Sequence, residues 1–139
     1  MINFYSENDF QLTEETAYSS WIKRVVASEE RKLGEVNYIF CDDEYLLKIN
    51  QQYLDHDTYT DIISFDNSLG NILGGDIFIS TQRVKENADE YKVPFEEELR
   101  RVMAHGVLHF CGYKDKTGEQ KEQMRAKEDE KMKMFHVEQ

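Results

Sequence analysis

The sequence predicts an α+β fold: a single domain over residues 1–139 in which a mixed sheet of about four strands packs with about five helices. Short β-branched and aromatic runs alternate with longer stretches of helical periodicity, in the order β-α-β-α-β-β-α-α-α. A length of 139 residues, with 40% hydrophobic and 32% charged side chains, is typical of one compact globular domain.

The first half of the chain is expected to contain two strands and two helices. Thr13 caps the first helix and Gly34 ends it, while Asp42 and Asp43 cap the second. The predicted elements are strands at residues 2–5 and 36–40, helices at residues 13–32 and 44–53, and a loop at residues 54–60.

The second half is expected to contain two strands followed by three helices. Ser80 or Thr81 caps the first of these helices, and Pro94 is tolerated at the start of the next. Gly112 ends that second helix by adopting a left-handed conformation. The predicted elements are strands at residues 61–65 and 73–80, a turn at 66–71, and helices at residues 81–91, 94–111 and 119–135.

Composition also limits the location and the covalent chemistry of the protein. The N-terminus has no basic start followed by an apolar run, and no stretch approaches the roughly 18 apolar residues of a membrane helix. We therefore expect a cytoplasmic protein that does not associate with a membrane. We also expect a monomer. Cys41 and Cys111 match no CxxC spacing, so we expect free thiols with no disulfide partner.

The net charge of −11 argues against a broad basic face for nucleic acid. Residues 1–113 carry 10 basic and 21 acidic side chains, whereas residues 114–139 carry 7 of each. Any bound polyanion would therefore be held locally, by a metal ion and a few lysines or arginines.

The strongest chemical signal is a pair of histidines one helical turn apart. His105 and His109 have the i, i+4 spacing that stacks two imidazoles on one helical face, within reach of one divalent metal ion, zinc above all. A hydrogen-bonded pair at the edge of the core explains the bare spacing equally well. Gly112 and Asp115 favour the metal site, because the chain can reverse at the glycine and return a third ligand. A water or His56 are the alternatives for that third position.

This spacing follows the logic of the metalloprotease signature HExxHxxGxxH, with two departures. Gly106 stands where those enzymes carry a glutamate base, which argues against a metallopeptidase, and its place on the buried side would let another element pack closely. Asp115 stands where they carry a third histidine, and a carboxylate is an acceptable zinc ligand.

Residues 105–115, HGVLHFCGYKD, resemble the pattern HGxLHxxGYDH of the YbeY endoribonucleases, also called ribosomal RNA maturation factors. Six of the eight specified positions match. The resemblance extends upstream to residues 49–53 (INQQY), 60–65 (TDIISF) and 75–80 (GDIFIS), in the same order as in the family. Most of the chain is therefore covered.

The resemblance implies a zinc-dependent hydrolase that cuts single-stranded RNA during ribosomal RNA maturation and ribosome quality control, with ribosomal RNA and the ribosome as partners. His105 and His109 take the ligand role from the family, and Asp115 takes the position of the third histidine. The family usually carries an arginine where this chain has Leu54, so no role passes to that position.

The expected nucleophile is a water molecule on the ion, since no side-chain base can be assigned; Asp115 is the one side chain with a candidate catalytic role. The candidate substrate-binding residues are Thr60, Ser64, Lys114 and Lys116. The alternative function is a noncatalytic, ribosome-associated metal-binding protein.

Overall fold

The computed structural model of the chain describes residues 1–56 and 58–135. Four strands and five helices follow one another in the predicted order. They are β1 (Ile2–Ser6), α1 (Glu15–Ser28), β2 (Lys32–Cys41), α2 (Asp43–Leu54), β3 (Ile62–Asp66), β4 (Ile72–Ser80), α3 (Thr81–Tyr91), α4 (Phe95–Phe110) and α5 (Gly118–Met132).

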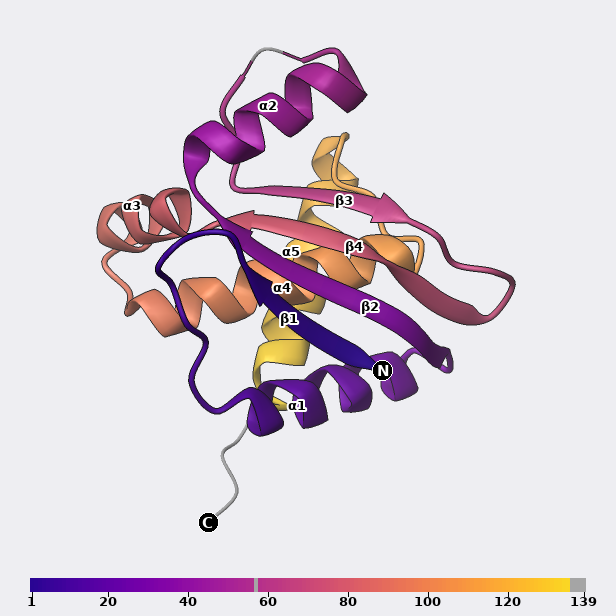
Figure 1. Cartoon of the computed structure of the whole chain (residues 1–139). Helices are drawn as coiled ribbons and strands as arrows, with labels where there is room; N and C mark the ends of the chain where they lie inside the picture. Colours follow the sequence, from indigo (N-terminus) through magenta and orange to yellow (C-terminus); the bar gives the residue numbers. More distant parts are fainter. Residues whose placement is uncertain (57, 136–139) are drawn as a thin grey trace.

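The four strands form one mixed sheet in the order β1-β2-β4-β3 (Figure 1). β1, β2 and β4 run parallel, and β3 pairs antiparallel with β4 at one edge. Because parallel neighbours need a crossover, α1 joins β1 to β2, whereas the antiparallel pair β3 and β4 needs only a short turn. The predicted α+β fold with a mixed four-stranded sheet is confirmed.

The main core lies between the sheet and the helices α1 and α4, with α4 and α5 behind the sheet in Figure 1. Trp21 of α1 is fully buried and donates its indole N–H to the backbone oxygen of Lys131 at 2.7 Å, which ties α5 to the core. Tyr38 of β2 is also fully buried and donates its hydroxyl to the backbone oxygen of Met103 in α4 at 2.9 Å. These two bonds satisfy polar atoms that would otherwise be costly to bury.

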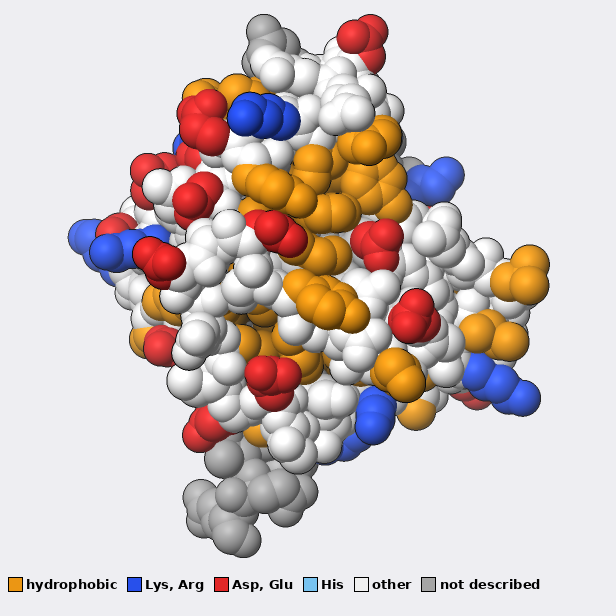
Figure 2. Space-filling model, in the orientation of Figure 1, with side chains coloured by type: hydrophobic (Ala, Val, Ile, Leu, Met, Phe, Trp, Pro, Cys, Tyr) orange, Lys and Arg blue, Asp and Glu red, His pale blue; other side chains and the backbone are white. Residues whose placement is uncertain are grey.

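The opposite face of the sheet is partly open, with α2 packed on β3 and β4. Figure 2 shows hydrophobic side chains and scattered acidic ones at the centre of this face, with lysines and arginines mostly toward its periphery. Asn3, Asn37 and Asp76 form a hydrogen-bonded ladder across three strands, with both N–O distances at 2.9 Å. Among the described residues, the centre of this face carries acidic and hydrophobic side chains but no cluster of lysines and arginines (Figure 2).

The first helix is shorter than predicted. It begins at Glu15, after Glu14 as the N-cap, so the predicted cap at Thr13 is wrong. The chain leaves the helix at Glu30, whose φ is 58°, and Lys32 N then bonds to Asn71 O and begins β2. Gly34, predicted to end the helix, lies inside β2, where a Cβ would meet Leu73 O at 2.8 Å. Pairing with β4 overrode the helical pattern here.

The later boundaries are closer to the prediction. Ser80 caps α3 by accepting a hydrogen bond from Arg83 N at 3.1 Å. β3 begins at Ile62, one residue later than predicted, and α5 ends at Met132 rather than near residue 135. Thr117 and Gln120 form a capping box at the start of α5, which the sequence analysis missed.

Cys41 and Cys111 are both buried, and neither forms a disulfide within the described residues. Burial raises the pKa of Cys41 to about 12 and that of Cys111 to about 11, so both are protonated at neutral pH. Within the described residues, no helix combines the length and apolar character needed to cross a membrane.

Replacing Gly75 by alanine is expected to lower the free energy of unfolding by about 3 kcal/mol, measured by urea denaturation. Gly75 has a φ of 153°, and an added Cβ would lie 2.2 Å from Phe65 O and 2.7 Å from Phe110 Cζ. Gly118→Ala is the control, because nothing lies within 4 Å of its Cβ position. Equal stability of the two variants would contradict the prediction.

Candidate metal centre

Helix α4 carries the two histidines on the side away from the core. Leu99, Met103 and Val107 are buried against the sheet and α1, whereas His105 and His109 are only half-buried. Gly106 lies between the histidines on the buried side, and a Cβ there would lie 3.0 to 3.1 Å from side-chain carbons of Ile77 and Ile62. The predicted close approach at Gly106 is confirmed, and it holds the histidines next to β3.

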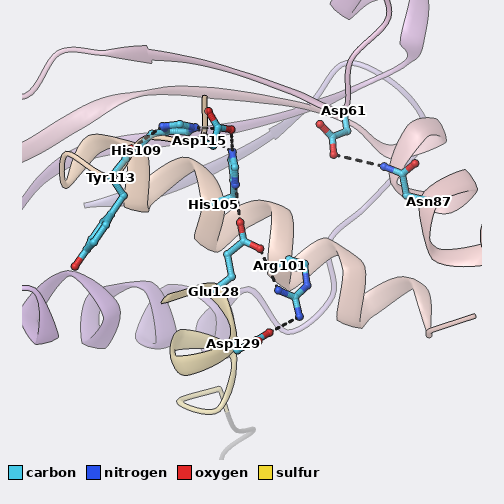
Figure 3. A network of polar contacts seen from close by, with 9 residues as sticks. All are labelled: Asp61, Asn87, Arg101, His105, His109, Tyr113, Asp115, Glu128 and Asp129. Carbon is cyan, nitrogen blue, oxygen red and sulfur yellow. Dashed lines mark hydrogen bonds and ion pairs between the residues drawn. The ribbon is translucent and has the colours of Figure 1, made fainter. Parts of the chain in front are cut away.

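The chain reverses directly after α4 and returns a carboxylate to the histidines. Gly112 has a φ of 103°, the positive value predicted for it. Asp115 Oδ2 then lies 3.1 Å from His105 Nε2 and 3.4 Å from His109 Nε2, and the two Nε2 atoms are 3.0 Å apart (Figure 3). Three potential ligand atoms therefore converge on one point.

The hydrogen-bond partners of the two rings fix which nitrogen faces that point without a hydrogen. His105 Nδ1 lies 2.6 Å from Glu128 Oε2, and His109 Nδ1 lies 2.9 Å from Tyr113 O. Both partners accept, so each Nδ1 carries the hydrogen and each Nε2 presents a lone pair. Two lone pairs and a carboxylate oxygen this close repel one another unless a cation lies between them.

The geometry of the three atoms suits a divalent ion such as zinc. Ligand atoms about 2.0 to 2.2 Å from a tetrahedral ion lie roughly 3.3 Å from one another, close to the 3.0 to 3.4 Å observed here. Across residues 1–56 and 58–135, these are the one group of three histidine, cysteine or acidic residues whose ligand atoms all lie within 4.8 Å of one another. His56 does not belong to it.

A buried ion-pair network from α5 holds His105. Glu128 accepts from His105 through Oε2 and contacts Arg101 Nη1 through Oε1 at 3.0 Å, and Arg101 in turn contacts Asp129 at 2.7 Å (Figure 3). The Glu128 side chain is only 7% exposed, so its carboxylate is held in one place. A carboxylate behind a ligating histidine fixes the ring orientation and makes it a better ligand.

The charges around the histidines favour a cation. Burial opposes the charged form of His105, but the hydrogen bond to Glu128 and the charges of Glu128, Asp115 and Asp61 outweigh it, so the pKa of His105 is raised. Burial also raises the pKa of Asp61, against the opposing charge of His105. A region that stabilises an imidazolium also stabilises a metal ion.

Two cavities, of about 380 and 570 Å³, meet at His109 and Asp115, and His105 lines the smaller one. Both are lined by Thr60, Ile62, Ser64, His109 and Asp115, so together they form one groove that crosses the candidate metal site. The smaller cavity extends between α3, α4 and α5, and the larger extends under the loop that follows α2.

A family model described as Endoribonuclease YbeY matches residues 2–136. The chain belongs to the YbeY family. The Endoribonuclease YbeY of Flavobacterium psychrophilum is 64% identical over 139 residues, covering 100% of this chain and 99% of the relative. That of Christiangramia forsetii is 62% identical over 138 residues, covering 99% and 96%.

A solved structure supports the fold independently. The solution structure of a Thermotoga maritima protein matches with a TM-score of 0.66 at 25% identity, covering 96% of this chain and 88% of that one. Asp115, predicted from the resemblance to stand in the place of a third histidine, brings its carboxylate within 4.8 Å of the ring nitrogens of His105 and His109.

The residues predicted to bind substrate are divided by the structure. Thr60 and Ser64 line both cavities, although the Thr60 hydroxyl also donates to Ile62 O at 3.4 Å in the turn before β3. Lys116 lines the larger cavity, while Lys114 is exposed and lines neither. Leu54, at the usual arginine position, lines the larger cavity.

The sequence analysis missed the parts of the site that come from α5 and from the end of the loop before β3. Glu128 lies 23 residues after His105 in a helix with charged residues all around, so no spacing marks it. Arg125 and Asp61 also line the smaller cavity. Tertiary packing places them there, so no sequence spacing marks them either. A raised pKa of a carboxyl group in a cleft marks Asp61, but only once the structure is known.

Tyr113 anchors the turn that carries Asp115. Its hydroxyl donates to Glu29 Oε1 at 2.7 Å, and Glu29 also contacts the buried Lys131 at 2.7 Å. The backbone oxygen of Tyr113 also accepts the hydrogen bond from His109 Nδ1. The turn, α1 and α5 are thus joined next to the ligands.

Tyr113→Phe is expected to lower the free energy of unfolding by about 1 kcal/mol, because one hydrogen bond to a carboxylate is lost while Glu29 keeps its lysine partners. Thermal unfolding of the metal-free protein measures it. Tyr53→Phe, on the exposed surface of α2, is the matched control and should change little. Equal effects would show that the turn does not depend on this bond.

Proposed function

We propose that the chain is a metal-dependent endoribonuclease that cuts single-stranded RNA in ribosomal RNA maturation and ribosome quality control. The observation that carries the proposal is the convergence of His105 Nε2, His109 Nε2 and Asp115 Oδ2, in a member of a family described as endoribonucleases. The proposed substrate is ribosomal RNA, and the proposed place of action is the cytoplasm, where two free thiols are also expected.

Zinc is the proposed ion because two imidazoles and one carboxylate form a ligand set that zinc commonly takes. Three protein ligands leave one coordination position open, whereas a structural zinc site is usually closed by four. A divalent ion with an open position supplies charge neutralisation at the phosphate and lowers the pKa of water. The open position supports catalysis over the noncatalytic metal-binding alternative.

The residues of the chain orient the ligands and the RNA. Glu128 and Tyr113 O hold the Nδ1 hydrogens, so both Nε2 atoms remain free to bind the ion. Thr60 and Ser64, at the boundary of the two cavities, are proposed to donate hydrogen bonds to phosphate oxygens. The bases of paired RNA are stacked and cannot splay out into such a groove, so a single strand is the better fit.

Cations at the two ends of the groove are proposed to hold the flanking phosphates. Arg125 on the smaller cavity and Lys116 on the larger have side chains that form no ion pair or hydrogen bond with other described residues. Arg101, by contrast, is engaged by Glu128 and Asp129. Two free cations and one metal ion suit local binding of RNA by a protein of net charge −11.

A metallopeptidase is a poorer fit. Gly106 stands where those enzymes carry the glutamate base, and its Cβ position is already within 3.1 Å of Ile62 and Ile77. A glutamate could not be accommodated there without moving α4 from the sheet.

His109→Ala is expected to weaken zinc binding by at least about 100-fold, beyond the range typical of residues outside the ligand shell, and to abolish cleavage of single-stranded RNA. Metal content and cleavage are measured on the same preparations. His56→Ala should keep its zinc, because His56 is not among the converging ligands. If the parent protein binds metal but fails to cleave RNA whichever divalent ion is supplied, the noncatalytic alternative is supported instead.

Glu128→Ala is expected to weaken zinc binding by about 10- to 100-fold, because His105 loses the carboxylate that orients its ring. Competition with a chromogenic chelator measures the affinity. Glu122→Ala, an exposed residue of the same helix, is the matched control with the same loss of charge. Equal affinities in the two variants would contradict the role given to Glu128.

A further inference from the structure

The smaller cavity contains a second group of polar side chains, separate from the candidate metal ligands. Asp61, Asn87 and Glu98 line it on the side toward α3 and the start of α4. Figure 3 shows Asp61 and Asn87 together, apart from the cluster of His105, His109 and Asp115. None of the three side chains is among the candidate metal ligands.

Glu98 is the unusual member of this group. It is only 6% exposed, it lines the cavity, and its carboxylate forms no hydrogen bond or ion pair with any other described residue. It lies seven residues before His105, two turns along the same face of α4. Among the described residues, only Arg24 Nε and Arg83 Nε are fully buried without a partner, so the Glu98 oxygens reach the cavity, where they are available to accept from a ligand.

Asp61 brings a second carboxylate to the same cavity. Its one side-chain hydrogen bond is a long one, accepted from Asn87 Nδ2 at 3.5 Å. Burial, followed by the charge of Asp61, raises the pKa of Glu98. Arg101 does not neutralise them by contact, because its guanidinium is engaged by Glu128 and Asp129.

The chemistry of this group selects its ligand. A phosphate is disfavoured by two carboxylates. Within the described part of the chain, only His105, His109 and Asp115 bring three potential ligand atoms together, so a second metal ion on Glu98 and Asp61 would depend on water for the rest of its coordination. What two acceptor-only carboxylates match is a neutral edge with adjacent N–H donors.

Among the RNA bases, guanine alone presents such an edge, with N1–H and the N2 amino group side by side; adenine, cytosine and uracil place an acceptor next to each donor. Unpaired bases of single-stranded RNA are commonly read on this edge while they stack on an aromatic ring. Tyr91, 56% exposed, lies at the same cavity and offers that ring.

We propose that the smaller cavity is a guanine-binding subsite, in which Glu98 and Asp61 accept the N1–H and N2–H donors of a base next to the scissile phosphate. The inference rests on the proposed endoribonuclease function, which places RNA across the metal site. Asn87 has a second amide hydrogen that can donate to guanine O6, and Arg125 at the same cavity can contact the adjoining phosphate. The enzyme then prefers RNA with guanine at this position.

The test measures binding of nucleoside 5′-monophosphates to the zinc-loaded protein, by NMR titration. The guanosine nucleotide should bind roughly tenfold more tightly than the adenosine, cytidine or uridine nucleotides, in the range of a bidentate base contact. The inosine nucleotide, which lacks the 2-amino group, should bind with intermediate affinity. Comparing the affinities of these nucleotides uses only the parent protein, so it tests the guanine subsite even if a substitution disturbs folding.

Glu98→Gln and Asp61→Asn should each remove most of the preference for guanine. Glu96→Gln, an exposed change of the same charge on the same helix, should keep it. Equal affinity for all the nucleotides overturns the subsite. So does a second equivalent of zinc that binds the parent and is lost in Glu98→Gln, when no guanine preference accompanies it.

RNA cleavage measured on the same preparations separates the two proposals. Failure to cleave any RNA with any divalent ion overturns the proposed function, while nucleotide binding still reports on the subsite. Cleavage without a preference for guanine near the cut overturns the subsite and leaves the endoribonuclease proposal standing.

Discussion

The close packing of α4 on the sheet is the constraint from which the site follows. Gly106 lets the helix approach Ile62 and Ile77 to van der Waals contact, and Gly75 makes room for Phe110 at the end of the same helix. With the helix held at this depth, His105 and His109 lie beside the residues that precede and begin β3. The groove therefore has the helix on one side and the sheet edge on the other, with the ligands where they meet.

The distribution of charge explains how a protein of net negative charge can bind RNA, which is also negatively charged. The negative charge near the histidines, from Asp115, Glu128 and Asp61, raises the pKa of His105 and suits a divalent cation. The cation then reverses the local charge for a phosphate, so a broad basic face is not required. The open face of the sheet, with its scattered acidic side chains in Figure 2, has no part in this.

Helix α5 connects the site to the rest of the fold. Its Glu128 orients His105, while its Lys131 is buried against Glu29 and its backbone accepts from Trp21 in the core. Glu29 also holds Tyr113, so the turn with Asp115 and the helix with Glu128 share one anchor. Ligand geometry is therefore set by side chains from three elements that are far apart in sequence.

The sequence alone determined the order of the nine elements, the reversal at Gly112 and the three candidate ligands, because these depend on local periodicity and on spacing within eleven residues. It misplaced the end of the first helix, since the pairing of Lys32 with Asn71 is a tertiary contact that local propensity does not contain. It also missed Glu128, Asp61 and Glu98. Only the tertiary structure brings these carboxylates to the cavity that the ligands line, because packing between elements decides it and no sequence period records it.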